Sequence, residues 1–228
     1  MLICSCEYCR SGKYNLCPDI KFAATPPYDG TLTKYYIVPY DMVTKLPENV
    51  SLEEGALMEP LSVAIHICRQ AEISAHKTVV VFGAGPVGLL VAAVAKAWGA
   101  SQVITVDIIQ GRLDFASKFA SSGTFLPEKF AEGESNIDYS QKVADKIKKE
   151  FNLGEGADCV IEATGAEVCT LTGLYACGKG ATFVQAGMGK AVLSAFPITL
   201  ICTREINVKG SFRYTHGCYR GTSFTLLY

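Results

Sequence analysis

Short apolar runs rich in β-branched residues alternate with stretches of helical periodicity over the last two-thirds of the chain. The runs predicted to form strands are residues 78–82, 102–106, 124–126, 158–162, 181–185 and 206–209. The stretches predicted to form helices are the apolar segment that begins near residue 87, then 112–119, 135–151 and 167–176. Strands that alternate with helices predict a parallel sheet covered on both faces, and six strands fit a doubly wound α/β fold.

The first 77 residues follow a different pattern. The elements expected there are a loop rich in cysteine, glycine and proline at 6–19, strands at 32–38 and 42–46, and a helix at 52–69. Ser51 is the expected N-cap of that helix, with Glu54 in the capping-box position. We expect this region to be the end of a β-rich domain that leads into the sheet through the helix.

The turn after the first predicted strand carries Gly83, Gly85 and Gly88. A G-x-G-x-x-G pattern alone is weak evidence, but in the order strand, turn, helix, strand, acid it is the fingerprint of a dinucleotide-binding βαβ unit. The first glycine permits a tight exit from the strand, the second lets a pyrophosphate approach, and the third lets the helix pack closely. The alternatives are a plain glycine turn or a membrane span, and two glycines and a proline near the middle argue against a span.

Asp107 stands at the end of the second predicted strand, 19 residues beyond Gly88. A carboxylate there accepts hydrogen bonds from a ribose 2′-hydroxyl and repels a 2′-phosphate, which favours NAD over NADP. Arg112 works against this preference, since a nearby arginine can accommodate the phosphate, or it can stack on adenine. The sequence therefore predicts NAD as the cofactor.

Composition narrows the remaining classes of protein. The chain has 228 residues, of which 49% are hydrophobic and 19% are charged, as in ordinary compact α/β proteins. The net charge of −1 and the lack of a basic block exclude nucleic acid as an expected partner. We recognise neither a signal peptide nor a membrane helix, so a cytoplasmic location is expected. Six of the ten cysteines are predicted to be reduced core residues, namely Cys68, Cys159, Cys169, Cys177, Cys202 and Cys218.

Several motifs give the chain a family resemblance. They lie at residues 14–18, 23–27, 53–57, 59–63, 83–88, 162–166 and 210–214. With these motifs the chain resembles the zinc-containing medium-chain dehydrogenases, and in particular their sorbitol/xylitol (polyol) dehydrogenase branch. The Glu-Pro-Leu-Ser segment at 59–62 and the Phe-Arg-Tyr segment at 212–214 are fairly specific to that branch.

The resemblance implies a domain organisation and an activity. Residues 1–70 would be part of a GroES-like catalytic domain, 71–216 the NAD-binding Rossmann domain, and 217–228 a truncated C-terminal tail. The family oxidises a secondary alcohol of a sugar alcohol to a ketose, with NAD as hydride acceptor and zinc as Lewis acid. The expected partner is thus a small polyol, besides a second copy of the chain paired through the Rossmann domain.

The resemblance also implies roles for individual residues. Glu59 matches the glutamate that binds the catalytic zinc or its water, and Arg213 and Tyr214 match a pair that orders that water and contacts substrate. The positions that match cofactor contacts are Val87, Asp107, Arg112, Ala186, Gly187, Met188, Ser211, Phe212 and Arg213. Glu59 lies in an apolar helix, where a buried glutamate needs a partner. Arg213 and Tyr214 could instead be ordinary residues at the end of a strand.

The chain departs from the family pattern at both zinc sites. It contains no His-Glu pair and no histidine before His66, so most ligands of the catalytic zinc are missing, and we expect a sequence truncated at both ends. Cys6, Cys9 and Cys17 match three of the four positions of the family's structural zinc site. The first position falls on Ile3, one residue before Cys4. These cysteines are either a zinc site completed by Cys4 or three leftover thiols.

The leading hypothesis is an NAD-dependent polyol dehydrogenase by family, with activity of this chain in doubt. One alternative is a non-catalytic NAD-binding remnant. Another is a zinc-free quinone or enoyl reductase of the same superfamily, which would have no use for Glu59 or the cysteine loop and would prefer NADPH.

Overall fold

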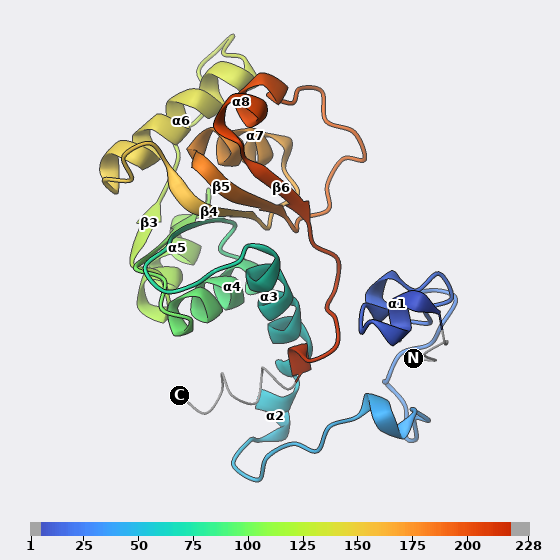
Figure 1. The fold of residues 1–228 in the computed structure, drawn as a ribbon. Coiled ribbons are helices and arrows are strands. Elements are labelled where there is room, and N and C mark those ends of the chain that lie inside the picture. The colour runs from blue at the N-terminus through green and yellow to red at the C-terminus, as the bar shows by residue number, and fades with distance from the viewer. Residues whose placement is uncertain (1–5, 220–228) are drawn as a thin grey trace. The chain divides into compact units, whose positions relative to one another are not determined.

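The computed structural model describes residues 6–219 (Figure 1). The chain divides into two compact units, which are described separately below. The first combines Met1–Ser62 with Arg213–Tyr228, and the second is Val63–Phe212. The first division follows residue 62, where a boundary at 70 was expected from sequence, and the second follows residue 212, where 216 was expected. Residues 1–5 and 220–228, which include Cys4 and most of the expected C-terminal tail, lie outside the described residues.

A parallel sheet of six strands forms the centre of the second unit. The strands are β1 Thr78–Phe82, β2 Gln102–Val106, β3 Gly123–Phe125, β4 Ala157–Glu162, β5 Cys177–Gln185 and β6 Asn207–Gly210. Their spatial order is β3-β2-β1-β4-β5-β6. The chain leaves β1 toward one edge and later returns to β4 on its other side, so the order reverses between β1 and β4. The doubly wound α/β fold predicted from the sequence is confirmed.

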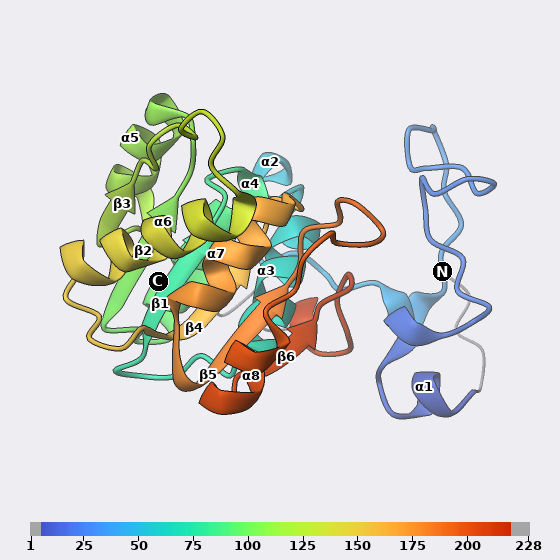
Figure 2. The ribbon, with the colours of Figure 1, turned by 90° about the horizontal axis from the view of Figure 1, so that it is seen from above.

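Helices cover both faces of this sheet (Figures 1 and 2). They are α4 Pro86–Ala97, α5 Gln110–Phe119, α6 Asn136–Glu150, α7 Glu167–Ala176 and α8 Ile198–Arg204. Helices α4 and α5 lie on one face, while α6 and α7 pack together on the other. Because helices cover both faces of the central strands, β1 is buried from Val79 to Phe82, and its sequence is a continuous apolar run.

The register of the strands aligns their carboxyl ends. Phe82 pairs with Val106 on one side and with Glu162 on the other. Glu162 in turn pairs with Gln185, and Gln185 with Gly210. The loops that follow β1, β2, β4, β5 and β6 therefore begin at the same edge of the sheet. In doubly wound folds the ligand binds at this edge, beside the point where strand order reverses.

Most predicted elements of the second unit agree with the structure to within two residues. The main difference is β5, which begins four residues earlier than expected, at Cys177. Ala157 pairs with Cys177, and the register then shifts so that Cys159 pairs with Thr182. The extra residues are glycine-rich, which hides the start of the strand from an apolar pattern. Cys202, expected in the core, is exposed on α8.

The helix predicted at 52–69 is divided into α2 Leu52–Gly55 and α3 Met58–Gln70. The capping box at Ser51 and Glu54 forms as expected. The break precedes Pro60, which has no N–H to donate to the carbonyl of Ala56 and is tolerated only in the first turn of a new helix. The first unit also contains the short helix α1 Glu7–Arg10 and two 3₁₀ helices, η1 Tyr14–Leu16 and η2 Tyr40–Met42.

The strands predicted at 32–38 and 42–46 are wrong for this structure. Residues 32–38 have no regular structure, and Ile37, at 97% exposure, is as open as Leu32. A strand requires a neighbour to accept and donate its hydrogen bonds. Among residues 6–62 the structure forms no strand that could pair with this segment.

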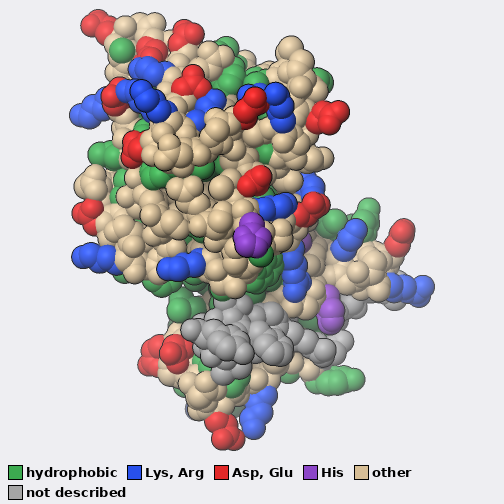
Figure 3. Space-filling model, turned by 60° about the vertical axis from the view of Figure 1, so that its left-hand side comes forward, with side chains coloured by type: hydrophobic (Ala, Val, Ile, Leu, Met, Phe, Trp, Pro, Cys, Tyr) green, Lys and Arg blue, Asp and Glu red, His purple; other side chains and the backbone are tan. Residues whose placement is uncertain are grey.

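Charged side chains of both signs are interspersed over the surface drawn in Figure 3. On α6, for example, Lys142 pairs with Glu134 and Lys146 with Glu128. None of the helices between residues 6 and 219 combines the length and apolarity needed to cross a bilayer.

Candidate cofactor site

The three glycines between β1 and α4 are needed for three different reasons. Gly83 has a φ of +106°, in the region that favours glycine. Gly85 is the N-cap of α4, and a Cβ built on it would meet nothing within 4 Å, so the space before the helix is open. A Cβ on Gly88 would lie 1.8 Å from the carbonyl oxygen of Gly83. The loop thus presents open backbone at the start of a 12-residue helix, where N–H groups and the helix dipole favour an anion.

Asp107 connects this loop to the end of β2. It is 9% exposed, and its carboxylate accepts hydrogen bonds from the backbone N–H of Ala84 at 2.8 Å and of Ile109 at 2.9 Å. Arg112, which is mostly exposed, approaches the carboxylate at 3.8 Å. The side chain is therefore fixed beside the glycine loop, and each oxygen retains a second acceptor site for another donor.

The loops after β5 and β6 reach the same edge of the sheet from its other half. The N–H groups of Ala186 and Gly187 donate to the backbone oxygen of Glu162 at 2.9 and 2.8 Å, while Met188 is 85% exposed. Ser211 donates its N–H to the carbonyl of Gln185. The hydroxyl oxygen of Ser211 is buried and has no hydrogen-bond partner among the described residues, as expected where a bound group would supply one.

Two other predicted positions flank these loops. Val87, the second residue of α4, is half-buried. Phe212, the last residue of the second unit, is exposed. The positions named from sequence in this unit thus gather at the carboxyl edge of the sheet, from Gly83 to Phe212.

Sequence reasoning assigned no role to Glu162 and Gln185, which meet at this edge. Glu162 is fully buried, and the amide of Gln185 donates to its carboxylate at 2.6 Å. A glutamate directly after the buried apolar run at 159–161 was the available signal, because a buried carboxylate requires hydrogen-bond donors.

Glu59, Arg213 and Tyr214 belong to the first unit. The glutamate was expected to be buried, but it is exposed at the start of α3. Nearby atoms still raise its pKa by desolvation, and the charge of Arg213 opposes that rise. Arg213 has a φ of +52° and places its guanidinium 3.9 Å from the ring centre of Phe22.

Tyr214 is buried and accepts a hydrogen bond from the hydroxyl of Tyr219 at 2.8 Å. Burial raises the pKa of Tyr214, so the phenol stays neutral at physiological pH. Burial likewise raises the pKa of Tyr14 to about 12. Glu59 and Tyr214 line one pocket of about 750 Å³ together with aromatic residues that sequence reasoning did not select, Tyr14 and Phe22.

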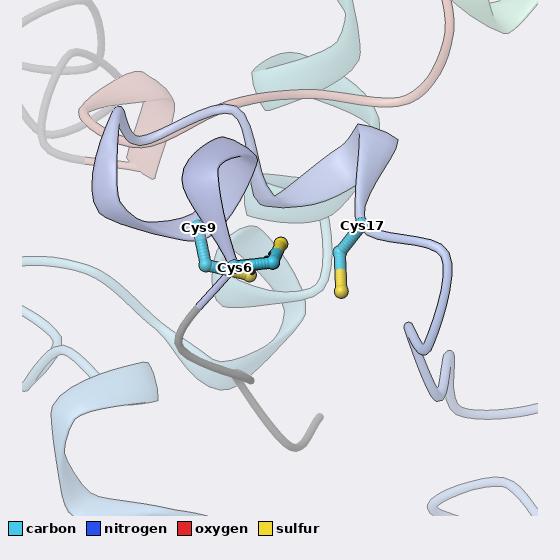
Figure 4. Close-up of side chains that lie close together, drawn as sticks. All are labelled: Cys6, Cys9 and Cys17. Carbon is cyan, nitrogen blue, oxygen red and sulfur yellow. Dashed lines mark hydrogen bonds between the residues drawn. The ribbon is translucent and has the colours of Figure 1, made fainter.

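The cysteine loop brings three thiols together. Cys6 is the N-cap of α1, Cys9 lies within that helix, and Cys17 follows η1 (Figure 4). All three sulfurs lie within 4.8 Å of one another, and those of Cys6 and Cys9 are 3.6 Å apart. Tetrahedral zinc with Zn–S bonds of 2.3 Å separates its sulfur ligands by about 3.8 Å. The three residues therefore fit three corners of a structural zinc site, and the expected fourth ligand, Cys4, lies outside the described residues.

The surroundings of Glu59 do not fit a catalytic zinc. Among the described residues, the only group of three or more side chains suited to hold a metal ion is the cysteine cluster. Glu59 can supply one oxygen, whereas a catalytic zinc takes three protein ligands. No step that depends on that metal follows from these residues.

The chain matches a known protein family and individual proteins of similar sequence. A family model described as zinc-binding dehydrogenase matches residues 86–226. D-xylulose reductase A of Aspergillus niger is 57% identical over 215 residues, which cover 94% of this chain and 58% of that protein. This chain thus spans less than two-thirds of the length of that relative.

Solved structures agree with this match. L-idonate 5-dehydrogenase from Escherichia coli str. K-12 substr. MG1655 is similar with a TM-score of 0.79 at 27% identity, covering 96% of this chain and 60% of that one. A structure from Sinorhizobium meliloti 1021 that is bound to NADP has a TM-score of 0.83 at 25% identity, covering 98% of this chain and 62% of that one.

Proposed function

Because the chain belongs to the zinc-binding dehydrogenase family, we propose that it binds NAD and serves the oxidation of a sugar alcohol of the xylitol or sorbitol type to a ketose. The family resemblance predicted from sequence is confirmed. Zinc and a nicotinamide nucleotide are typical of this family. That the nucleotide is NAD and the substrate a polyol is proposed. The observation that carries it is the carboxylate of Asp107, held against the glycine loop at the end of β2.

The residues present fit the two halves of a dinucleotide. The open backbone at Gly85 would hold the pyrophosphate, and Asp107 would accept hydrogen bonds from the adenosine ribose and disfavour a 2′-phosphate. The nicotinamide half would lie over β4–β6, where the loop at Ala186–Met188 and the hydroxyl of Ser211 offer polar contacts. When bound, the nicotinamide supplies the acceptor for a hydride from the alcohol carbon.

Around the first-unit pocket the chain's own groups offer binding rather than a complete reaction centre. Tyr214 stays protonated and can position a hydroxyl of a polyol, while Glu59 and Arg213 add opposite charges. The activation of the alcohol needs metal ligands that the described residues do not supply. The proposed polyol reaction therefore requires metal ligands from outside the described residues.

The lack of such ligands among the described residues favours a second candidate for this chain, a protein that binds NAD without turnover. The two candidates differ in metal content and in activity. Both require the cofactor site described above.

The test uses the purified 228-residue chain. NADH binding is titrated by nicotinamide fluorescence, with NADPH as the matched ligand, and reduction of NAD is followed with xylitol and sorbitol. We expect NADH to bind more tightly than NADPH. Binding with turnover would establish the dehydrogenase, and binding without turnover the second candidate. A chain that binds neither nucleotide would refute both, and tighter binding of NADPH would refute the role of Asp107.

The assembly and location of the chain also remain proposals. β6 is an edge strand of the sheet, with the side chain of Val208 partly exposed, which supports pairing with a second copy. A cytoplasmic location stays a prediction from the sequence.

A further inference from the structure

Glu162 is a fully buried carboxylate at the end of β4, the strand beside the reversal of strand order. Its Oε1 accepts hydrogen bonds from the N–H groups of Thr164 at 2.8 Å and Gly165 at 3.0 Å, and also from the hydroxyl of Thr164. Its Oε2 accepts from the N–H of Gly165 at 3.0 Å and the amide of Gln185 at 2.6 Å. All of these donors are uncharged, so this carboxylate is held by a cage of dipoles and not by an ion pair.

The cage connects loops from different strands. Thr164 and Gly165 belong to the loop after β4, and Gln185 is the last residue of β5. The amide of Gln185 also donates to the carbonyl of Gly187 at 2.8 Å, and its oxygen accepts from the hydroxyl of Thr170 at 3.1 Å. One carboxylate thus fixes the loop after β4 directly and the loop after β5 through a single amide.

These loops approach one another so closely that their glycines have no room for a Cβ. A Cβ on Gly187 would lie 2.1 Å from the nitrogen of Gly165 and 2.6 Å from Oε2 of Glu162. A Cβ on Gly189 would lie 1.7 Å from the carbonyl oxygen of Gly165. On the other side, a Cβ on Gly83 would meet the methyl group of Thr164 at 3.0 Å. The loops after β1, β4 and β5 are therefore packed against one another around Glu162.

We propose that Glu162 is a positioning residue, which sets the loops after β4 and β5 in the arrangement that receives the nicotinamide half of the cofactor. The proposal rests on the proposed function, because it assumes that a dinucleotide crosses the sheet edge with its adenosine half at Asp107. It assigns the two halves to separate carboxylates. Asp107 would contact the adenosine half directly. Glu162 would act on the nicotinamide half only through the backbone groups that it holds in place.

The test compares two ligands on the same purified chain, NADH and ADP-ribose, which lacks the nicotinamide. Glu162→Gln replaces one carboxylate oxygen with an NH₂ group. This group faces the same donors but cannot accept the hydrogen bonds that the oxygen accepted. We expect NADH to bind roughly tenfold more weakly, which is the loss of about one to two hydrogen bonds. ADP-ribose should bind within about twofold of its original affinity, and the fluorescence of bound NADH should change because its nicotinamide environment changes.

The matched control is Asp158→Asn. Asp158 lies at the other end of the same strand and accepts from the N–H and hydroxyl of Thr78, both at 2.8 Å. That variant also loses carboxylate hydrogen bonds in β4, but it should leave the ratio of NADH to ADP-ribose affinity unchanged. A merely structural role for Glu162 would make the two variants behave alike.

Two further variants separate the remaining outcomes. Gln185→Met leaves Glu162 intact and should weaken NADH selectively, which keeps the test decisive if Glu162→Gln does not fold. The double variant Glu162→Gln with Gln185→Glu exchanges donor and acceptor and should recover part of the NADH affinity. Equal losses for NADH and ADP-ribose in Glu162→Gln and Gln185→Met would overturn the inference. If the unaltered chain binds neither ligand, the proposed function itself fails.

Discussion

The glycines at 85 and 88 differ in what surrounds them, and alanine at each should therefore give a different result. Gly85 has ordinary dihedral angles, φ −79° and ψ 179°, and open space where a Cβ would stand, so Gly85→Ala should change stability by less than about 1 kcal/mol. Its methyl group would stand in the expected path of the pyrophosphate and should weaken NADH binding at least about tenfold.

Gly88→Ala forces a methyl group into the backbone of Gly83 and should destabilise the fold by about 3 kcal/mol. Urea unfolding and NADH fluorescence measured on both variants separate the two effects. A stable Gly88→Ala protein, or unchanged NADH affinity in Gly85→Ala, would contradict the assignment.

Asp107→Ala should weaken NADH binding by about 1–3 kcal/mol if its carboxylate accepts hydrogen bonds from the ribose. The preference for NADH over NADPH should shrink as well, because the charge that repels a 2′-phosphate is removed. A general loosening of the glycine loop would affect both nucleotides equally, so the ratio of their affinities is the measurement that matters. Asp114→Ala, on the exposed face of α5, is the control and should leave the ratio unchanged.

At this scale the sequence predicted the position of a residue well where its neighbours are close in sequence. The spacing of Gly83, Gly88 and Asp107 is tied to consecutive elements, so it predicts neighbours in space. It predicted poorly where burial depends on distant packing. Glu59 follows an apolar pattern but stands at the exposed start of α3, and the partners of Glu162 come from segments up to 23 residues away.

At the scale of elements, the loop with α1 and η1 is predicted to bind zinc through its three cysteines. Cys17→Ser should abolish zinc binding, because two thiols cannot complete the site that three of them begin. Metal analysis, and the absorption of bound Co²⁺ as a replacement, would measure this. Cys202→Ser, at an exposed cysteine of α8, is the control and should retain zinc. An unaltered chain purified with zinc available but holding none would contradict the site.

The strands and helices of the second unit could be predicted because their signals are local. Buried parallel strands read as apolar runs, and each helix repeats its apolar face every turn. The same local signals failed to predict the structure of the first unit. Residues 32–38 have the composition of a strand, but a strand forms only with a partner, and sequence pattern does not reveal whether one is present.

At the scale of the whole molecule, the two units differ in how much regular structure protects their backbone. Lys34 lies in an exposed segment without helix or strand, between exposed Thr33 and Tyr35, whereas the sheet edge from Gly83 to Ser211 is tied together by hydrogen bonds. Trypsin should therefore cleave first near Lys34. Cleavage within residues 78–210 should be slower and should depend on the cofactor.

NADH at 100 times its Kd would stabilise a binding unit by about 2.7 kcal/mol, so cleavage that requires the second unit to open should slow by up to about a hundredfold. Cleavage at Lys34 should continue at its original rate, because that segment is open in the first unit whether or not the cofactor is bound. Mass spectrometry of timed digests with and without NADH measures both rates at once. Equal protection of Lys34 and the second unit would mean that cofactor binding orders both units together, and first cuts within the sheet would mean that the second unit is not the more stable of the two.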